Sequence, residues 1–237
     1  MCCNWRRHRN RTYDHSSVPP HLTSTEHRLV ANGAKVYILG RRKDTLEAAA
    51  KHYGQNNQII PVECDVTSKQ SIESAVKTIS QNEAHIHLLV NNSGIAGPKS
   101  ATEASSASRL KEDLFEFSEW DDVYRTSISA LYFTALAFLP LLKKATESEK
   151  GFSASIINVT SISGLTKASQ NHFCYNSSKA GAIHLTRLLA TELVSGIRDQ
   201  GSESRLSNVF VSTRSHRVSS VCLFLNDVDC SIRDDDG

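Results

Sequence analysis

Residues 153–194 read SASIINVTSISGLTKASQNHFCYNSSKAGAIHLTRLLATELV, and this stretch decides the fold class. It opens on a short apolar run with β-branched side chains, which is typical of a buried strand. Residues 174–194 then have the length and composition of a long helix. A buried strand followed by a long helix is half of a βαβ unit, in which right-handed crossovers join parallel strands.

The same alternation of strand and helix runs through the preceding residues. In chain order we expect the last turns of a helix closing at Gly33, a strand at 35–40, a helix ending at Gly54, a strand at 58–66, a helix from Thr67 to about Asn82, a strand starting at His85, and a helix from Ser118 to about Lys144. The apolar stretch 130–142 is shorter than the roughly 20 residues of a membrane span, so we interpret it as a buried helix. The sequence therefore predicts an α/β, Rossmann-like, three-layer α/β/α fold around a parallel sheet.

Composition changes at both ends of the chain. Residues 1–24 lack glycine and contain adjacent prolines, which predicts an irregular or disordered segment. Residues 25–197 form a partial Rossmann-type domain, and 198–237 form a divergent tail. In that tail SNVFVST and VCLFLND are candidate short strands. We expect residues 208–212 to pair beside the strand at 153–160.

The composition also bears on partners and location. With a net charge of +2 and no basic stripe, nucleic-acid binding is disfavoured. The six cysteines contain no C-x-x-C pair, so no zinc site is expected, and we favour packing over metal binding for His85 and His87. No apolar run follows the N-terminal arginines, which indicates a reducing, cytoplasmic setting without a membrane partner, with a mitochondrial presequence as the alternative.

Tyr175 and Lys179 lie four residues apart in the long predicted helix, so they share one helix face. An ammonium group beside a phenol favours the phenolate, and such a pair suits acid/base chemistry between a carbonyl and an alcohol. Ser161 follows the preceding strand, and NNSG at 91–94 follows the strand before it. Ligands of open α/β sheets bind beyond these carboxyl ends.

These motifs resemble the short-chain dehydrogenase/reductase family over residues 25–197. Ser161, Tyr175 and Lys179 match its catalytic serine, tyrosine and lysine. The resemblance implies that Tyr175 protonates the substrate oxygen, that Ser161 holds that oxygen, and that Lys179 assists Tyr175 and binds the nicotinamide ribose. It also assigns cofactor contacts to Asp65 and Val66 in the segment CDV, and to Asn91 and Gly94 in NNSG.

The resemblance implies a nicotinamide cofactor and a small carbonyl or alcohol substrate. An acidic side chain at the end of the strand at 35–40 would select NAD(H). The sequence there is Gly40-Arg41-Arg42, and the arginine fork of Arg41 suits the extra phosphate of NADP(H), which we favour. The family's subunits pair through the helices matching 118–144 and 172–195, which predicts a homodimer or homotetramer.

Three departures from the family pattern lead to a second hypothesis. No glycine precedes Gly33, so the glycine loop that holds the pyrophosphate and its strand are missing. Ser127 stands where the family has an asparagine that supports a proton relay, and no P-G follows the long helix. We therefore expect a gap in the middle of the sheet, weak NADPH binding and negligible turnover. The alternative function is an inactive remnant without cofactor binding, from a truncated or misassembled reading frame.

Overall fold

The computed structural model describes residues 29–30, 32–53, 58–97, 99, 106–115, 120–148, 152–196 and 220–224. The strands are β1 Lys35–Gly40, β2 Ile59–Glu63, β3 Leu88–Asn91, β4 Ser155–Asn158 and β5 Ser220–Phe224. The helices are α2 Lys43–Tyr53, α3 Lys69–Ser80, α4 Ala107–Leu114, α5 Trp120–Tyr124, α6 Ala130–Ser148 and α7 Phe173–Gly196. Of these helices, α4 has no counterpart in the sequence prediction, because its polar, serine-rich surroundings look like a surface loop.

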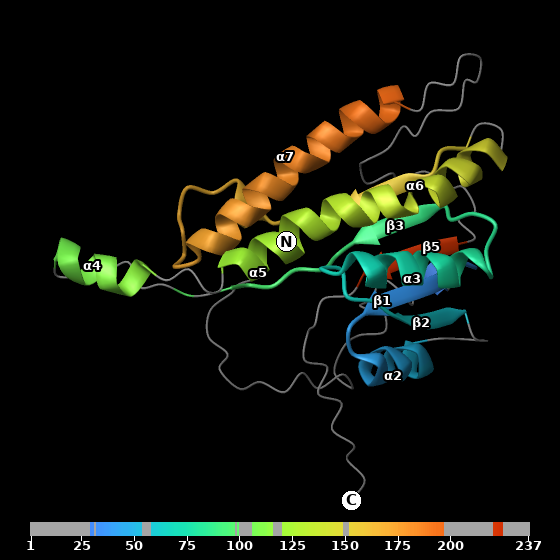
Figure 1. The fold of residues 1–237 in the computed structure, drawn as a ribbon, viewed down its shortest axis with the longest axis horizontal. Helices are drawn as coiled ribbons and strands as arrows, with labels where there is room; N and C mark the ends of the chain where they lie inside the picture. The colour runs from blue at the N-terminus through green and yellow to red at the C-terminus, as the bar shows by residue number, and fades with distance from the viewer. Residues whose placement is uncertain are drawn as a thin grey trace, which may run out of the picture.

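The strands form one sheet in the order β2-β1-β5-β3-β4, and every neighbouring pair is parallel. Successive side chains of β1 point to opposite faces, as a pleated strand requires. Val36 and Ile38 pack with Leu46 of α2 on one face, whereas Tyr37 and Leu39 join the core under α3 and α6 on the other. Figure 1 shows this layering. The predicted α/β three-layer fold is confirmed.

The centre of the sheet holds a strand from the far end of the chain. β5 lies between β1 and β3, with Val221 level with Val36 and Leu88, and Cys222 level with Leu89. The predicted gap was therefore wrong. Two buried apolar strands need partners for their backbone N–H and C=O groups, and the apolar run VCLF supplies those partners on both sides. Residues 208–212, predicted to pair beside β4, lie outside the described residues.

The helix ends agree with the sequence in part. Gly33 has φ +86°, which suits the residue that closes a helix, as predicted. The cap of α3 is Ser68, whose Oγ accepts from Ser71 N at 3.3 Å, rather than the expected Thr67. Thr67 instead donates to Asp65 Oδ1 through both its N–H and its hydroxyl. The predicted cap was one residue early because serine and threonine stand side by side.

The longest helical stretch runs from Trp120 to Ser148 and includes a π-helical turn at Arg125–Ser129. By length and composition this stretch could cross a membrane. Phe138 and Leu142 are nevertheless fully buried in the core that also contains Leu89 of β3. This packing is that of a core helix, as the sequence indicated.

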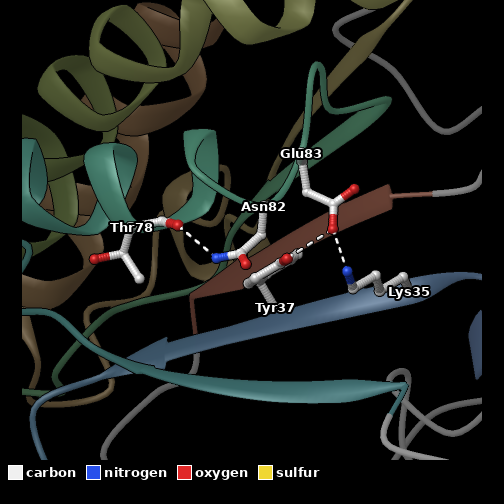
Figure 2. Close-up of polar contacts among 5 residues, drawn as sticks. All are labelled: Lys35, Tyr37, Thr78, Asn82 and Glu83. Carbon is white, nitrogen blue, oxygen red and sulfur yellow. Dashed lines mark hydrogen bonds and ion pairs between the residues drawn. The ribbon is translucent and has the colours of Figure 1, made fainter.

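A polar cluster secures the end of the sheet opposite to the strands' carboxyl ends. Tyr37 is buried, and its hydroxyl donates to Glu83 Oε1 at 2.7 Å. Lys35 pairs with the same carboxylate, so one acid joins two side chains of β1 to the loop after α3 (Figure 2). Asn82 Nδ2 donates to Thr78 O at 2.9 Å and closes the end of α3. The cluster therefore fixes α3 against β1.

We expect Glu83→Ala to destabilise the fold by about 1–3 kcal/mol, because it removes the carboxylate that accepts from the Tyr37 hydroxyl and pairs with Lys35. The double variant with Tyr37→Phe should recover part of that loss, since donor and acceptor are then both removed. Urea denaturation of the two single variants and the double variant gives their free energies of unfolding, and the departure from additivity is the coupling between Tyr37 and Glu83. Losses that simply add would contradict the hydrogen bond.

Candidate active site

The side chains singled out by sequence lie at one edge of the sheet. Arg41 follows β1, Asp65 follows β2, Asn91 ends β3 and Ser161 follows β4 by three residues. Because the strands are parallel, their carboxyl ends meet at this edge. Tyr175 stands in the first turn of α7, whose start lies close to the turn that contains Ser161. The sheet topology thus gathers the predicted residues into one region.

Tyr175 and Lys179 form the centre of the site. The Lys179 Nζ lies 5.6 Å from the centroid of the Tyr175 ring. The same ammonium donates to the carbonyl oxygen of Val159 at 3.1 Å, which ties α7 to the end of β4. Ser161 begins a short 3-10 turn, and its Oγ accepts from Ser163 N at 3.1 Å. The Ser161 hydroxyl proton is therefore still available to a ligand oxygen.

Lys179 is a buried cation, with 5% of its surface exposed. Burial lowers the pKa of Lys179, because the charged form loses its hydration. Among the described residues no carboxylate forms an ion pair with it. The charge of Lys179 therefore faces the carbonyl oxygen of Val159 and the ring of Tyr175.

Gly164 sets the distance between the Ser161 turn and α7, and sequence reasoning missed it. A Cβ at this position would lie 2.7 Å from both Ala180 N and the Lys179 carbonyl carbon. Since both atoms belong to backbone, neither can move aside cheaply. Gly164 therefore lets the turn touch the helix directly at the lysine. The sequence offered no signal for this contact beyond the glycine itself.

We expect Gly164→Ala to push the Ser161 turn away from α7 and to cost about 1–3 kcal/mol, the usual range for overpacking. The displacement would also separate Ser161 from Tyr175, so any turnover at this site should fall more than the affinity for its substrate does. Gly33→Ala is the control: it stresses the backbone, where φ is +86°, far from this contact. Equal effects of both variants on turnover would argue against a positioning role for Gly164.

A hollow lies between the carboxyl ends of three strands, β1, β2 and β3. Its walls come from Gly40 and Arg41, from residues 64–67, from Ser93 to Ile95, and from Thr126. Burial would raise the pKa of Asp65, but hydrogen bonds from Thr67 and the charge of Arg41 outweigh it, so that the pKa lies below its ordinary value. Burial raises the pKa of the neighbouring Cys64 thiol to about 11, which keeps it neutral. Both a neutral thiol and charged side chains therefore line the hollow, and the predicted Arg41, Asp65, Val66 and Gly94 are among its lining residues.

The side chain of Asn91 points into a buried hydrogen-bond chain. Its Oδ1 accepts from Thr134 Oγ1 of α6 at 2.8 Å, and its Nδ2 donates to Asn158 Oδ1 of β4 at 2.9 Å. Asn158 Nδ2 donates in turn to Thr186 Oγ1 of α7 at 3.1 Å. The chain links α6, two strands and α7. The Asn91 amide is therefore used in hydrogen bonds that hold the structure together, and the chain fixes α7 relative to the sheet.

Ser127 occupies the π-helical turn that interrupts the long helix. It is buried, and its Oγ has no hydrogen-bond partner among the described residues. The side chain lines a second, smaller hollow together with Asn91, Thr134 and Val159. Turns of this kind occur frequently at functional sites, because they redirect a side chain without ending the helix. The sequence identified the position but gave no sign of the π turn.

Comparison with known proteins identifies the family. The family model described as short chain dehydrogenase matches residues 23–199. The chain belongs to the short-chain dehydrogenase family. Its members are oxidoreductases, and the expected residues Ser161, Tyr175 and Lys179 all lie inside the matched range.

Curated relatives and solved structures agree with this assignment. The short-chain dehydrogenase/reductase PhomF of Diaporthe leptostromiformis is 37% identical over 172 residues, covering 70% of this chain and 58% of the relative. SAT3 of Stachybotrys chartarum (strain CBS 109288 / IBT 7711) is 34% identical, covering 72% and 69%. A 3-ketoacyl-(acyl-carrier-protein) reductase of Brucella melitensis, solved with NADH, has a TM-score of 0.59 at 28% identity, covering 71% and 63%. This chain thus spans well under two thirds of PhomF's length.

Proposed function

We propose that this chain is an NADP(H)-dependent oxidoreductase that interconverts a carbonyl group and a secondary alcohol. The supporting observation is the buried Lys179 ammonium, 5.6 Å from the Tyr175 ring and without an acidic partner among the described residues. A cation in that place favours a negative charge on the tyrosine oxygen. Tyr175 can then give and take a proton at the substrate oxygen.

Each residue of the set has a distinct task in this proposal. Tyr175 Oη donates the proton to the carbonyl oxygen during reduction and accepts it back during oxidation. Ser161 Oγ donates a hydrogen bond to the same oxygen, while its lone pairs hold the Ser163 N–H. Lys179 supplies the positive charge, and its hydrogen bond to Val159 fixes the position of that charge. NADP(H), when bound, supplies the hydride.

The residues around the hollow fit the adenosine half of the cofactor. Asp65, Val66 and Gly94 provide a slot between strand ends. Arg41 is exposed at its rim and offers a planar fork for a phosphate, while β1 ends without an acidic residue. Both features favour NADP(H) over NAD(H). The sequence has no T-G-x-x-x-G-x-G motif to hold the pyrophosphate.

The test is turnover of a ketone and aldehyde panel with NADPH and NADH, alongside fluorescence titration of each cofactor. Tyr175→Phe should abolish turnover and leave NADPH binding intact. Tyr132→Phe, on the exposed side of α6, is the matched control. Full activity of the Tyr175→Phe variant would refute the proposed proton donor, and equal affinity for the two cofactors would refute the preference.

A second candidate function is a family member without cofactor binding. Specific observations favour it: β5 fills the central position of the sheet, and no T-G-x-x-x-G-x-G motif occurs in the sequence. A dinucleotide would then lack the helix N-terminus that binds its pyrophosphate. Millimolar NADPH failing to quench protein fluorescence or to turn over any substrate would favour this candidate.

We also propose a homodimer or larger assembly. Phe133 and Tyr132 of α6 and Leu188 of α7 expose large apolar surfaces. Such surfaces on neighbouring helices mark protein contacts. We expect Phe133→Glu to shift the chain towards the monomer in light scattering at tens of micromolar. A monomeric mass for the unsubstituted chain would contradict this prediction.

A further inference from the structure

His172 stands immediately before α7 and beside Tyr175. Its backbone carbonyl accepts from Asn176 N at 2.9 Å, which joins the residue to the first turn of the helix. Its ring meets the Tyr175 ring edge to face, with the two centroids 6.4 Å apart and the planes at 65°. A small ligand at the Tyr175 hydroxyl can therefore also contact His172.

The turn that leads into α7 fixes the position of His172 at an energetic cost. Gln170 and Asn171 have φ values of 51° and 65°. His172 N donates to Ser169 O at 2.9 Å, and this bond across two residues of positive φ defines a type I′ turn. Asn176 Nδ2 donates to the same Ser169 oxygen at 2.9 Å and anchors the turn on the helix. Holding a glutamine in the left-handed region costs about 1–3 kcal/mol, and such strain is often found at functional sites.

The two ring nitrogens of His172 have different surroundings. The residue as a whole is only partly buried. Its Nδ1 atom, however, is fully buried and has no hydrogen-bond partner among the described residues. A neutral imidazole carries its proton on one nitrogen, and the other nitrogen is an acceptor. A buried N–H without a partner is rarer than a buried acceptor without one, and the positive end of α7 favours the lone pair at Nδ1. Both arguments place the proton on Nε2, where a ligand can reach it.

Exposed apolar side chains lie in the segments that carry the candidate site. Ile162 and Leu165, in the turn after β4, have 71% and 65% of their surface exposed. Phe173, two residues before Tyr175, has 44% exposed. Ligand sites combine apolar walls with a few polar groups that fix orientation. The apolar skeleton of a substrate can cover these side chains, and His172 is the polar group next to them.

We propose that His172 determines substrate specificity, because its Nε2–H donates a hydrogen bond to a second oxygen of the substrate while Tyr175 acts on the first. The substrate class is then an apolar carbonyl compound with an acceptor oxygen close to the reacting carbonyl, such as a β-keto ester. The reaction at Tyr175 rests on the proposed function. The position of the His172 donor does not, because it follows from the turn and from the buried Nδ1.

The proton position is tested on the full chain without any ligand. Multiple-bond ¹H–¹⁵N correlation spectra at pH 8 distinguish the protonated ring nitrogen from the bare one. Comparison with the spectrum of the His172→Gln variant, which lacks these signals, assigns them. We expect the proton on Nε2. A proton on Nδ1 would overturn the proposal, because the donor would then be buried.

Specificity is tested with two ketones of equal length, methyl 3-oxo-3-phenylpropanoate and phenyl butyl ketone, which lacks the ester oxygens. Each is titrated into the chain with NADPH present, and turnover is followed in parallel. The unsubstituted chain should bind the keto ester about tenfold more tightly than the ketone, the contribution of one hydrogen bond. His172→Phe keeps a ring beside Tyr175 but has no donor, and it should lose this preference. His172→Gln offers an amide N–H in place of Nε2–H, and it should keep the preference.

Phenyl butyl ketone is the internal control, because its affinity should be the same in all three proteins unless a variant disturbs the structure of the site. A preference for the keto ester that survives in His172→Phe, or that the unsubstituted chain lacks, would overturn the proposal. Turnover of both ketones in that case leaves the proposed function standing. A preference that depends on His172 without any turnover would instead refute the proposed function and support the specificity. Failure of both ketones to bind would overturn both.

Discussion

Replacing Cys222 by proline is expected to unfold the domain rather than to loosen one strand. Residue 222 is the middle of β5, and β5 pairs with a neighbour on each side. Proline has no N–H, and it occurs in sheets essentially only at edges or bulges. The unpaired buried acceptor alone costs about 1–3 kcal/mol. Poor packing of the ring between two strands adds to that loss, against a total stability of about 5–15 kcal/mol.

Urea denaturation followed by circular dichroism measures this effect. We expect the Cys222→Pro variant to lose the cooperative transition, while Cys222→Val, which keeps the N–H and suits a strand, unfolds like the unsubstituted chain. Unchanged cooperative unfolding of the proline variant would show that β5 does not complete the sheet. The sequence alone predicted the opposite situation, a sheet already weakened by an empty centre.

The sequence predicted the strands and helices of the fold well where local pattern decides them. Buried strands such as β1 are short apolar runs, and α2 ends next to a glycine, so periodicity and turn chemistry suffice. The position of β5 depends instead on a pairing between residues almost two hundred positions apart. Local pattern carries no information about such a pairing. The strand order of the family predicted an empty position between β1 and β3, because the family's first strand is missing. The structure places β5 in that position, where it supplies hydrogen-bond partners to the backbones of both neighbours.

The candidate site shows the same division. Tyr175 and Lys179 follow from helix spacing, and Ser161 follows from its place after a strand. The features that position them do not, because they depend on contacts between elements. The close approach at Gly164, the hydrogen-bond chain through Asn91 and the π turn at Ser127 all arise when two or more elements pack together. The sequence predicted which residues form the candidate site, and the structure shows the contacts that position them.

Lys179→Met should separate activity from stability. If the proposed function holds, removing the ammonium beside Tyr175 lowers turnover by about 10²–10⁴-fold, the usual share of positioned acid/base catalysis. The fold should nevertheless become more stable at neutral pH. Methionine fills a similar volume, and the variant no longer buries a cation that lacks an acidic partner among the described residues. The freed Val159 carbonyl belongs to a residue exposed to solvent, so water can take the place of Nζ.

The stability gained by Lys179→Met should depend on pH, and this dependence tests the prediction more sharply. Burial lowers the pKa of Lys179 in the folded chain, whereas the unfolded chain keeps the ordinary lysine value of 10.5. Between these two values the unfolded state binds more protons than the folded state, so the stability of the unsubstituted chain rises with pH. The cost of the buried charge is therefore fully present below the lowered pKa and fades as pH rises towards 10.5.

We expect the stability advantage of Lys179→Met to be constant near neutral pH and to shrink through the alkaline range. Thermal unfolding of both proteins across pH 6–10, read against the same scan for the surface variant Lys77→Met, measures it. An advantage that stays flat through the alkaline range, or a loss of stability at neutral pH, would show that Lys179 contributes to the fold as a paired cation. The lysine would then be a structural residue rather than one kept for its chemistry.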